Sequence, residues 1–587
     1  MRATHTMALK RARPAVHEGY LIDPGLVPSQ LLEPKERSPV PIRPPERKWG
    51  LQRMRLRLRL VAWLLKLVGV LILRRQPSQA MAQQLCDILG EFGGLLVKLG
   101  QLLSLRPDLF NNEFCEVLAR LQFKAVGFSP ELAKQIVREQ LGRPIEDVFD
   151  IFEEKPIAAA SIAQVHRARL RDQQVWVVVK VLRPDVARRF MDDLETIRGW
   201  VNVLRRMPGL QYFTWNEMLD ELEGVMREEV DLRYEAANVR RMRKTLRRHR
   251  VYVPRVFKWS SRQILVIEFV PGVLMTDVIR MHTDDPGRLR RWMQENDVEP
   301  EKLGRRLFVT LQRQLFEDNL FHGDLHPGNI LVLRGGRVAL IDFGSVGSMD
   351  ANYLQVFKGY TRAMGEGDFP AAADYLMLLT EGLPPIDTEA FKEEVTKPFR
   401  AWALKARMKE LPYGEKSISG VALAASKIIL RYRIVLSWQF MKVNRASATL
   451  DASLAVLLAS ADYGGLIRTY FMGAERRANR SFGKRVKRLV EEFQADKDYL
   501  TSLAELISYR GARLQEDTSS KVAVVGAFFF QILKVSVFLV LVGLVYRLMA
   551  QGISWGFMLL AIAAGVVLLV AHQIQSYLAR PEYERTS

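Results

Sequence analysis

The chain has 587 residues, with 86 Lys and Arg against 65 Asp and Glu and a net charge of +21. This length excludes a single small domain and is enough to bury a sizeable core. The basic balance favours an anionic partner such as a lipid surface, a nucleic acid or a phosphate-rich ligand. The two cysteines, Cys86 and Cys115, are too few for a disulfide framework or a metal cluster. We predict no secretory signal peptide, because the N-terminus lacks a compact apolar stretch with a small-residue cleavage site.

The N-terminal stretch changes character near residue 50. Residues 1–50 are rich in proline and charge without a sustained period, which predicts a disordered arm. Arginines at every second position then precede the apolar run Leu60 to Leu73. This run is short for a membrane span, which needs roughly 20 apolar residues. It indicates either a basic helix lying in a membrane interface or an ordinary docking helix.

Residues 80–121 have the pattern of helices. Within them, Lys98 and Gln101 stand three residues apart and therefore share a helix face. Polar groups on an otherwise apolar helix indicate contact with a neighbouring site, although composition alone would make them surface residues.

From residue 130 the pattern becomes mixed α and β. The β-branched run Val175 to Val181 predicts a buried strand that carries Lys180 near its end. A buried ammonium needs a partner, and otherwise this lysine reaches solvent from the strand end. A later predicted helix supplies four candidate carboxylates: Glu228, Glu229, Asp231 and Glu235. Spacing alone does not decide among them.

Another strand, Gln263 to Val270, is ended by Pro271 and Gly272. We interpret this as a hinge between two lobes, where an adenine would meet backbone groups. Glu268 within the strand is predicted to belong to the cofactor site. An apolar-periodic helix at residues 300–319 leads towards the next segment.

The stretch from Leu320 to Val346 carries the candidate chemistry. Asp324 and Asn329 lie on either side of a Pro-Gly turn, and Asp342 follows two apolar runs joined by Gly335 and Gly336. Glycines between apolar runs predict a hairpin, which would fold Asp342 back beside Asn329. Two carboxylates and an amide suit Mg²⁺ that carries nucleotide phosphates.

The C-terminal third is predicted to be mostly helical, and two apolar segments follow it. Residues 553–571 contain no charge, whereas residues 522–546 contain Lys534, which costs about 2.5–3.5 kcal/mol at mid-span. With a short link between them, they predict a transmembrane hairpin whose basic flanks lie on the cytoplasmic side. The alternative is a hairpin buried in the protein core.

Together these segments resemble a protein-kinase-like fold and, more narrowly, the UbiB family of atypical kinases. The order of motifs carries the resemblance: Lys98-Leu99-Gly100-Gln101, then the Ala-rich loop from Ala158, Lys180, Glu229-Val230-Asp231, the Asp324/Asn329 turn and Asp342-Phe343-Gly344. It implies an α+β, bilobal kinase-like fold with an N-terminal helical extension carrying the KxGQ motif and a C-terminal transmembrane hairpin. The expected domains are the arm (1–50), the basic helix with the KxGQ extension (51–129), an N-lobe (130–272), a mostly helical C-lobe (273–515) and the hairpin (520–575).

The resemblance also implies the roles of the site residues. Lys180 contacts phosphates and pairs with Glu235, Asp324 is the catalytic aspartate, and Asn329 and Asp342 hold Mg²⁺ beside ATP. The loop Ala158, Ala159, Ala160 and Ser161 replaces a Gly-rich phosphate loop, and alanine lacks glycine's access to positive φ. Lys98 and Gln101 are expected over the cleft, facing Glu229 and Asp231. Such a site disfavours protein substrates.

The implied function is ATP hydrolysis that supports ubiquinone or other isoprenoid-lipid biosynthesis at the inner (cytoplasmic) membrane. The expected partners are membrane lipids, quinone precursors and quinone-biosynthesis enzymes, with no nucleic acid and with a homodimer left open. Two alternatives remain from sequence: an ATP-switched lipid-binding scaffold without turnover, and a small-molecule phosphotransferase of the aminoglycoside or choline kinase type.

Overall fold

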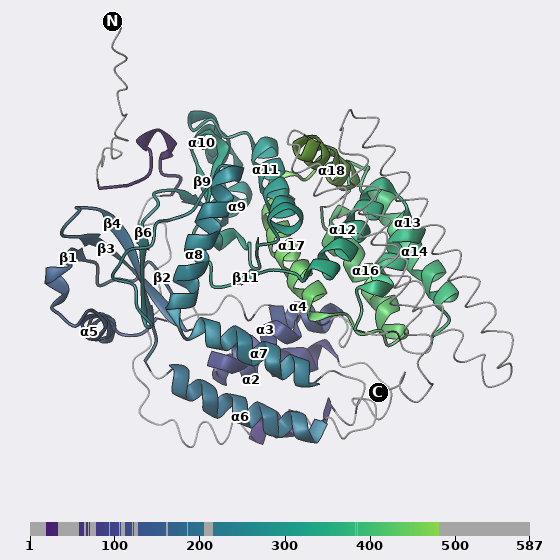
Figure 1. Cartoon of the computed structure of the whole chain (residues 1–587), viewed down its shortest axis with the longest axis horizontal. Coiled ribbons are helices and arrows are strands. Elements are labelled where there is room, and N and C mark those ends of the chain that lie inside the picture. The colour runs from purple at the N-terminus through teal and green to yellow at the C-terminus, as the bar shows by residue number, and fades with distance from the viewer. Residues whose placement is uncertain are drawn as a thin grey trace, which may run out of the picture. The chain divides into compact units, whose positions relative to one another are not determined.

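The described part of the chain runs, with gaps, from Gly19 to Asn479 (Figure 1). The structure, a computed structural model, describes residues 19–32, 58–63, 66–67, 70, 78–121 and 127–479. Short gaps interrupt the last two ranges, the longest at residues 205–214. Residues 522–571, for which the sequence predicts a transmembrane hairpin, lie outside the described residues.

An antiparallel five-stranded sheet forms the first lobe. Its strands are β1 (Phe149–Phe152), β2 (Ala158–Ala159), β3 (Ala163–Leu170), β4 (Trp176–Leu182) and β6 (Ile264–Glu268), in the order β1-β3-β4-β6 with β2 paired to β3. Strand β4 lies at the centre, as its β-branched sequence predicts, because both of its neighbours pair with it along most of its length.

Helices cover both faces of this sheet. The helix α5 (Pro130–Leu141) begins at the Ser129 cap, ends at Gly142 with φ +65°, and packs Ile136 against the core of β3 and β4. The helix α8 (Leu232–Leu246) buries Leu232 and Ala236 against the ends of β4 and β6. The strand residue Lys180 therefore lies between a sheet and a helix that carries carboxylates.

A group of N-terminal helices packs beside α8. They are α2 (Gln79–Phe92), α3 (Gly94–Leu103), α4 (Asn112–Ala119), α6 (Val186–Leu204) and α7 (Trp215–Glu229), and α3 contacts both α6 and α7 (Figure 1). The described residues of the preceding basic segment join them. Leu60, Trp63 and Leu67 are buried, and Trp63 Nε1 donates to Met81 O at 2.9 Å. These contacts favour the docking helix over the interfacial one.

The prediction of a disordered arm over residues 1–50 is wrong for residues 19–32. Trp176 N of β4 donates to Gly19 O at 2.8 Å, and Ile22, 2% exposed, packs with residues of the hinge and the second lobe. Ser29 N donates to Asn296 Oδ1 at 2.8 Å. The segment therefore straps the two lobes together. This segment is itself rich in apolar side chains, but the prolines and charges of residues 1–50 as a whole hide that local composition.

The second lobe has a small sheet and many helices. Its strands are β5 (Val251–Tyr252), β7 (Val273–Leu274), β9 (Ile330–Leu333) and β10 (Arg337–Leu340), with a separate pair β8 (Phe321–His322) and β11 (Val346–Gly347). Its helices are α9 (Met275–Asp284), α10 (Pro286–Glu295), α11 (Pro300–Arg313), α12 (Ala351–Glu366), α13 (Phe369–Leu378), α14 (Thr388–Lys405), α15 (Tyr413–Lys416), α16 (Ile418–Arg431), α17 (Trp438–Leu457) and α18 (Tyr463–Asn479). Within the described ranges, no helix is both long and apolar enough to cross a membrane.

Candidate functional site

A tight hairpin brings the two halves of the site together. Strands β9 and β10 pair in register from Arg337 opposite Leu333 to Leu340 opposite Ile330. Gly335 and Gly336 make the turn with φ of +68° and +57°, which residues with a Cβ rarely adopt. Ile341 N consequently donates to Asn329 O at 3.2 Å. Asp342, the next residue along the chain, therefore emerges beside the Asn329 turn.

Lys180 lies at the centre of the site. Its Nζ donates to Glu235 Oε1 at 3.0 Å and Oε2 at 2.9 Å, and to Asp342 Oδ2 at 2.9 Å. The side chains of Lys180, Glu235 and Asp342 are 15%, 6% and 39% exposed. Of the four carboxylates that the sequence left open as partners, the structure selects Glu235. It adds Asp342, so one ammonium bridges two carboxylates.

The charges of this group are mutually dependent. Burial acts against the charged form of Lys180, but the Asp342 and Glu235 carboxylates raise the pKa of the amine. Burial also acts to raise the pKa of Asp342, yet Lys180 and the Gly344 N–H hold the pKa of this carboxyl well below its usual range. For the more buried Glu235, burial raises the pKa and Lys180 opposes the rise. Removing the lysine would leave two carboxylates facing each other.

Asp324 is held by its neighbours through the backbone. Asp324 N donates to His322 Nδ1 at 3.1 Å, and Asn329 Nδ2 donates to Asp324 O at 3.0 Å. Because Nδ1 accepts, Nε2 carries the proton and donates to Asp342 O at 2.5 Å. Burial lowers the pKa of His322, which fits this neutral form. His322 thus ties both aspartates to one ring, a role that the sequence interpretation missed although the histidine stands only two residues before Asp324.

Arg445 of α17 is a second residue that the sequence interpretation missed. Its Nη2 donates to Asp324 Oδ2 at 2.8 Å, and the two side chains are 10% and 21% exposed. Asp324 Oδ1 is buried and has no hydrogen-bond partner among the described residues. One oxygen of the candidate catalytic carboxylate is therefore fixed by a guanidinium while the other is available to a ligand. Nothing in the local helical sequence marks this arginine.

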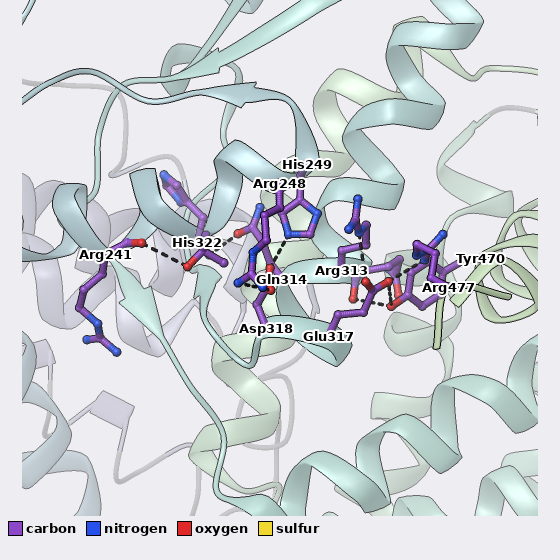
Figure 2. Close-up of polar contacts among 12 residues, drawn as sticks. Arg241, Arg248, His249, Arg313, Gln314, Glu317, Asp318, His322, Tyr470 and Arg477 are labelled. Atoms are coloured by element: carbon purple, nitrogen blue, oxygen red, sulfur yellow. Dashed lines mark hydrogen bonds and ion pairs between the residues drawn. The ribbon is translucent and has the colours of Figure 1, made fainter. Parts of the chain in front are cut away.

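A π-helical turn that follows α11, Gln314–Asp318, contacts His322 (Figure 2). Gln314 Oε1 accepts from His322 N at 2.8 Å. Asp318 binds His249 at 2.5 Å, and Glu317 binds Arg477 of α18 at 2.6 Å. Turns of this type are frequent at functional sites. Here the extra residue lets adjacent acidic side chains contact α18 and the segment after α8 while Gln314 contacts the site.

The four predicted gating residues are used differently. Lys98 of α3 forms an ion pair with Glu229 at the end of α7, and each side chain is 15% exposed. Asp231 instead caps α8, where its Oδ1 accepts from Arg233 N at 3.0 Å. The side chain of Gln101 makes no hydrogen bond within the described ranges. The structure therefore brings one gating pair together, and the motif position of Asp231 has a helix-capping explanation.

The Ala-rich loop is described in part. Ala158 and Ala159 form β2 and pair with Val165 and Gln164 of β3, whereas residues 160–161, predicted in the cofactor site as Ala160 and Ser161, lie outside the described residues. The following Gln164 accepts from Phe128 N at 2.8 Å and contacts His166 Nε2 at 2.8 Å. This part of the motif is therefore a buried structural network.

Glu268 does not fit the predicted cofactor role through its side chain. This residue is 1% exposed, and its carboxylate accepts from Tyr252 Oη at 2.5 Å and from Arg255 N at 3.1 Å. Burial raises the pKa of Glu268, and the Tyr252 hydroxyl opposes the rise. These partners occupy both carboxylate oxygens within the protein.

The donor set fits a magnesium ion that is carried by a nucleotide. Asn329 uses Nδ2 in its hydrogen bond to Asp324, which leaves the amide oxygen for a ligand, and the Asp342 side chain is 39% exposed. No cluster of three His, Cys, Asp or Glu ligands occurs among the described residues. Two hard oxygen ligands alone do not make a complete cage, but phosphates would supply the remaining ligands.

Comparisons with known proteins find sequence similarity to kinase-like proteins. Residues 120–373 match the ABC1 atypical kinase-like domain, which gives the described residues an α+β kinase-like fold preceded by helices. The chain is 34% identical over 264 residues to "Probable protein kinase UbiB" of Vibrio parahaemolyticus, covering 44% of this chain and 46% of that protein. It is 33% identical over 299 residues to "Protein ACTIVITY OF BC1 COMPLEX KINASE 8, chloroplastic" of Arabidopsis thaliana, covering 49% and 37%.

These matches confirm the resemblance that the sequence motifs indicated, and a kinase-like domain implies ATP binding. The matched segments span about half the length of the UbiB relatives, for example 58% of the Vibrio cholerae protein, which is 31% identical. A solved structure titled "The complex structure of Rv3197-erythromycin from Mycobacterium tuberculosis" aligns with a TM-score of 0.44 and 26% identity, covering 66% of this chain and 94% of that one.

Proposed function

We propose that the protein binds Mg·ATP and hydrolyses it, or transfers its phosphoryl group to a small acceptor, because residues 120–373 match the ABC1 atypical kinase-like domain and the chain is similar to proteins named UbiB. One observation carries the proposal. Lys180 lies between Glu235 and Asp342, and the Asn329 turn with Asp324 lies beside Asp342. Phosphoryl transfer needs mainly positioning and charge, and these groups provide both.

Each residue would have a distinct task. Asn329 and Asp342 would hold Mg²⁺, which supplies positive charge against the phosphates when it is bound. Lys180, oriented by Glu235, would neutralise phosphate oxygens. Asp324 would use its unpartnered Oδ1 to orient and deprotonate the attacking water or hydroxyl.

The acceptor is proposed to be water or a small hydroxyl compound. Support comes from the pair between Lys98 and Glu229, which joins α3 to α7, and from alanines in place of a Gly-rich loop. Through the resemblance to UbiB proteins we further propose a role in ubiquinone or other isoprenoid-lipid biosynthesis beside a membrane. Membrane anchoring would depend on residues 522–571, which lie outside the described part of the chain.

Replacing the metal-binding carboxylate tests this function. Asp342→Asn should lower ATP hydrolysis by about 100-fold or more, because an amide holds the metal and Lys180 poorly. Asp368→Asn is a matched control, since Asp368 caps α13 and asparagine caps equally well. ATPase activity is measured on purified full chain with contaminating ATPases excluded. An Asp342→Asn protein that hydrolyses ATP at the wild-type rate would contradict the proposal.

The contact between Arg445 and Asp324 favours one second candidate. One oxygen of Asp324 is already held by the Arg445 guanidinium, as expected of a carboxylate that positions a bound nucleotide in a conformational switch on a lipid scaffold. Nucleotide affinity without turnover, even with anionic lipid and quinone-precursor-like phenols present, would favour this scaffold. Turnover that depends on Asp342 would exclude it.

A further inference from the structure

A cavity of about 430 Å³ lies in the helical second lobe, and none of the residues that line it belongs to the Lys180 site. The end of α12, the last turns of α14 and the start of α18 line it, with Arg400, Trp402, Arg407 and Arg468 among its residues. Cavities of this size hold ligands as large as a sugar phosphate or a lipid headgroup.

The acidic residues in the lining are already neutralised by partners. Glu366 accepts from Arg362 Nε at 2.8 Å. Asp462 pairs with Arg468 Nη2 at 3.3 Å and accepts from Gly465 N at 3.0 Å. These carboxylates therefore do not compete for the remaining cations of the cavity.

Two arginines of the lining have no partner among the residues that the structure describes. Arg400 and Arg407 are both exposed, and neither side chain makes a hydrogen bond or an ion pair with the described residues. Arg468 is held in place because its Nη1 donates to Gly365 O at 2.8 Å. Arginine forks match phosphate oxygens in geometry and charge. The uncompensated charge around the cavity is thus positive and suited to a phosphate group.

The walls of the cavity add an apolar surface. Trp402 is 3% exposed, and its Nε1 donates to Lys416 O at 2.8 Å, so only its hydrocarbon faces remain. Leu404 in the lining is 65% exposed, and Met408, one residue beyond Arg407, is 50% exposed. Apolar and positively charged side chains therefore lie close together at the end of α14 and in the residues just after it, a combination that suits an amphiphile.

We propose that this cavity binds a phosphate-bearing ligand of headgroup size, with Arg400 and Arg407 contacting the phosphate and Leu404 covering an attached apolar group. The proposal goes beyond nucleotide binding and does not depend on it. A soluble organic phosphate and a phospholipid headgroup share this chemistry, and the experiment separates them.

Binding is measured with the full chain and three probes. Inorganic phosphate and glycerol phosphate are titrated by calorimetry, and phosphatidylglycerol vesicles are compared with phosphatidylcholine vesicles by co-sedimentation. The double variant Arg400→Gln/Arg407→Gln should weaken binding by about tenfold or more, because it removes two charge-assisted contacts. The matched control Arg290→Gln/Arg291→Gln removes the same charge from exposed positions on α10 and should change binding by less than about twofold.

Each outcome decides the proposal. If the cavity variant loses glycerol phosphate binding and the control variant does not, the ligand is a soluble phosphate. If the cavity variant loses phosphatidylglycerol binding and the control variant does not, the ligand is a lipid headgroup. Unchanged ATPase activity in the same variant places the effect outside the nucleotide site. Equal losses in both double variants, full binding by the cavity variant, or no binding of any probe by the wild type would overturn the proposal.

Discussion

Replacing Lys180 by methionine isolates the charge balance at the centre of the site. The change keeps the length of the side chain but removes the cation that bridges Glu235 and Asp342. Breaking a buried ion pair costs about 3–5 kcal/mol, because the remaining charge loses both water and partner. Most of this loss should come from Glu235, 6% exposed, and less from Asp342, which is 39% exposed and partly solvated.

The loss of stability should depend on pH in a defined direction. Burial already raises the pKa of Glu235, and removing Lys180 takes away the main group that opposes that rise. A carboxyl whose folded-state pKa lies above its unfolded value gives its full stability below the unfolded pKa and loses it as pH rises through the folded pKa. The deficit of Lys180→Met relative to wild type should therefore be small near pH 5 and full near pH 8.

Urea unfolding followed by tryptophan fluorescence measures this deficit at each pH. Lys134→Met is the matched control, because Lys134 pairs with Glu154 on the surface, where the side chains are 33% and 68% exposed. The control should lose less than about 1 kcal/mol. A Lys180→Met protein that matches the control, or whose deficit is equal at both pH values, would refute the reasoning.

Three other substitutions test separate contacts. Arg445→Met should lower ATP hydrolysis about ten- to hundredfold and stability by about 1.5–3 kcal/mol. The control is Lys442→Met on the same helix, where the Lys442 side chain is 45% exposed, and it should change neither quantity by as much. Equal effects in both variants would contradict a positioning role for Arg445. Burial lowers the pKa of His166, so the stability of the wild type should fall as pH drops below about 6.5, where only the unfolded state takes up the proton. His166→Gln should reduce the dependence of stability on pH by up to about 1.4 kcal/mol per pH unit. If wild type and variant show the same pH dependence, His166 is not its cause. Ile22→Ala should destabilise by about 2–4 kcal/mol in urea if residues 19–32 strap the lobes, and a change below about 0.5 kcal/mol would show that they do not.

Local sequence signals predicted the local parts of the site. The β9–β10 hairpin follows from two apolar runs around Gly335 and Gly336, and it alone brings Asp342 back to Asn329. The partner of Lys180 could not be predicted in this way, because the spacing of four nearby carboxylates did not distinguish one from another. Only the family resemblance singled out Glu235 before the structure did.

Contacts between distant segments were not predictable in this way. Arg445 and Asp324 are 121 positions apart, and a buried arginine inside a helix has no sequence pattern that distinguishes it from an exposed one. The prediction of disorder for residues 19–32 was wrong for a related reason. The buried residues of this segment, Ile22, Leu31 and Leu32, are few, and their partners lie elsewhere in the chain, so a count of prolines and charges predicted disorder.

Helix α17 links these distant contacts into one arrangement. Arg445 binds Asp324, and three residues earlier Lys442 binds Glu221 of α7 at 2.8 Å. At the start of the same helix, the centre of the Trp438 ring lies 4.9 Å from Cζ of Arg106. Arg106 stands just beyond the end of α3. This one helix therefore contacts the N-terminal extension through Arg106, α7 through Glu221, and the candidate catalytic carboxylate of Asp324. We therefore expect that a displacement of α3 or α7 would move Arg445 or break these contacts, which would couple the extension to the cleft through α17 as well as through Lys98.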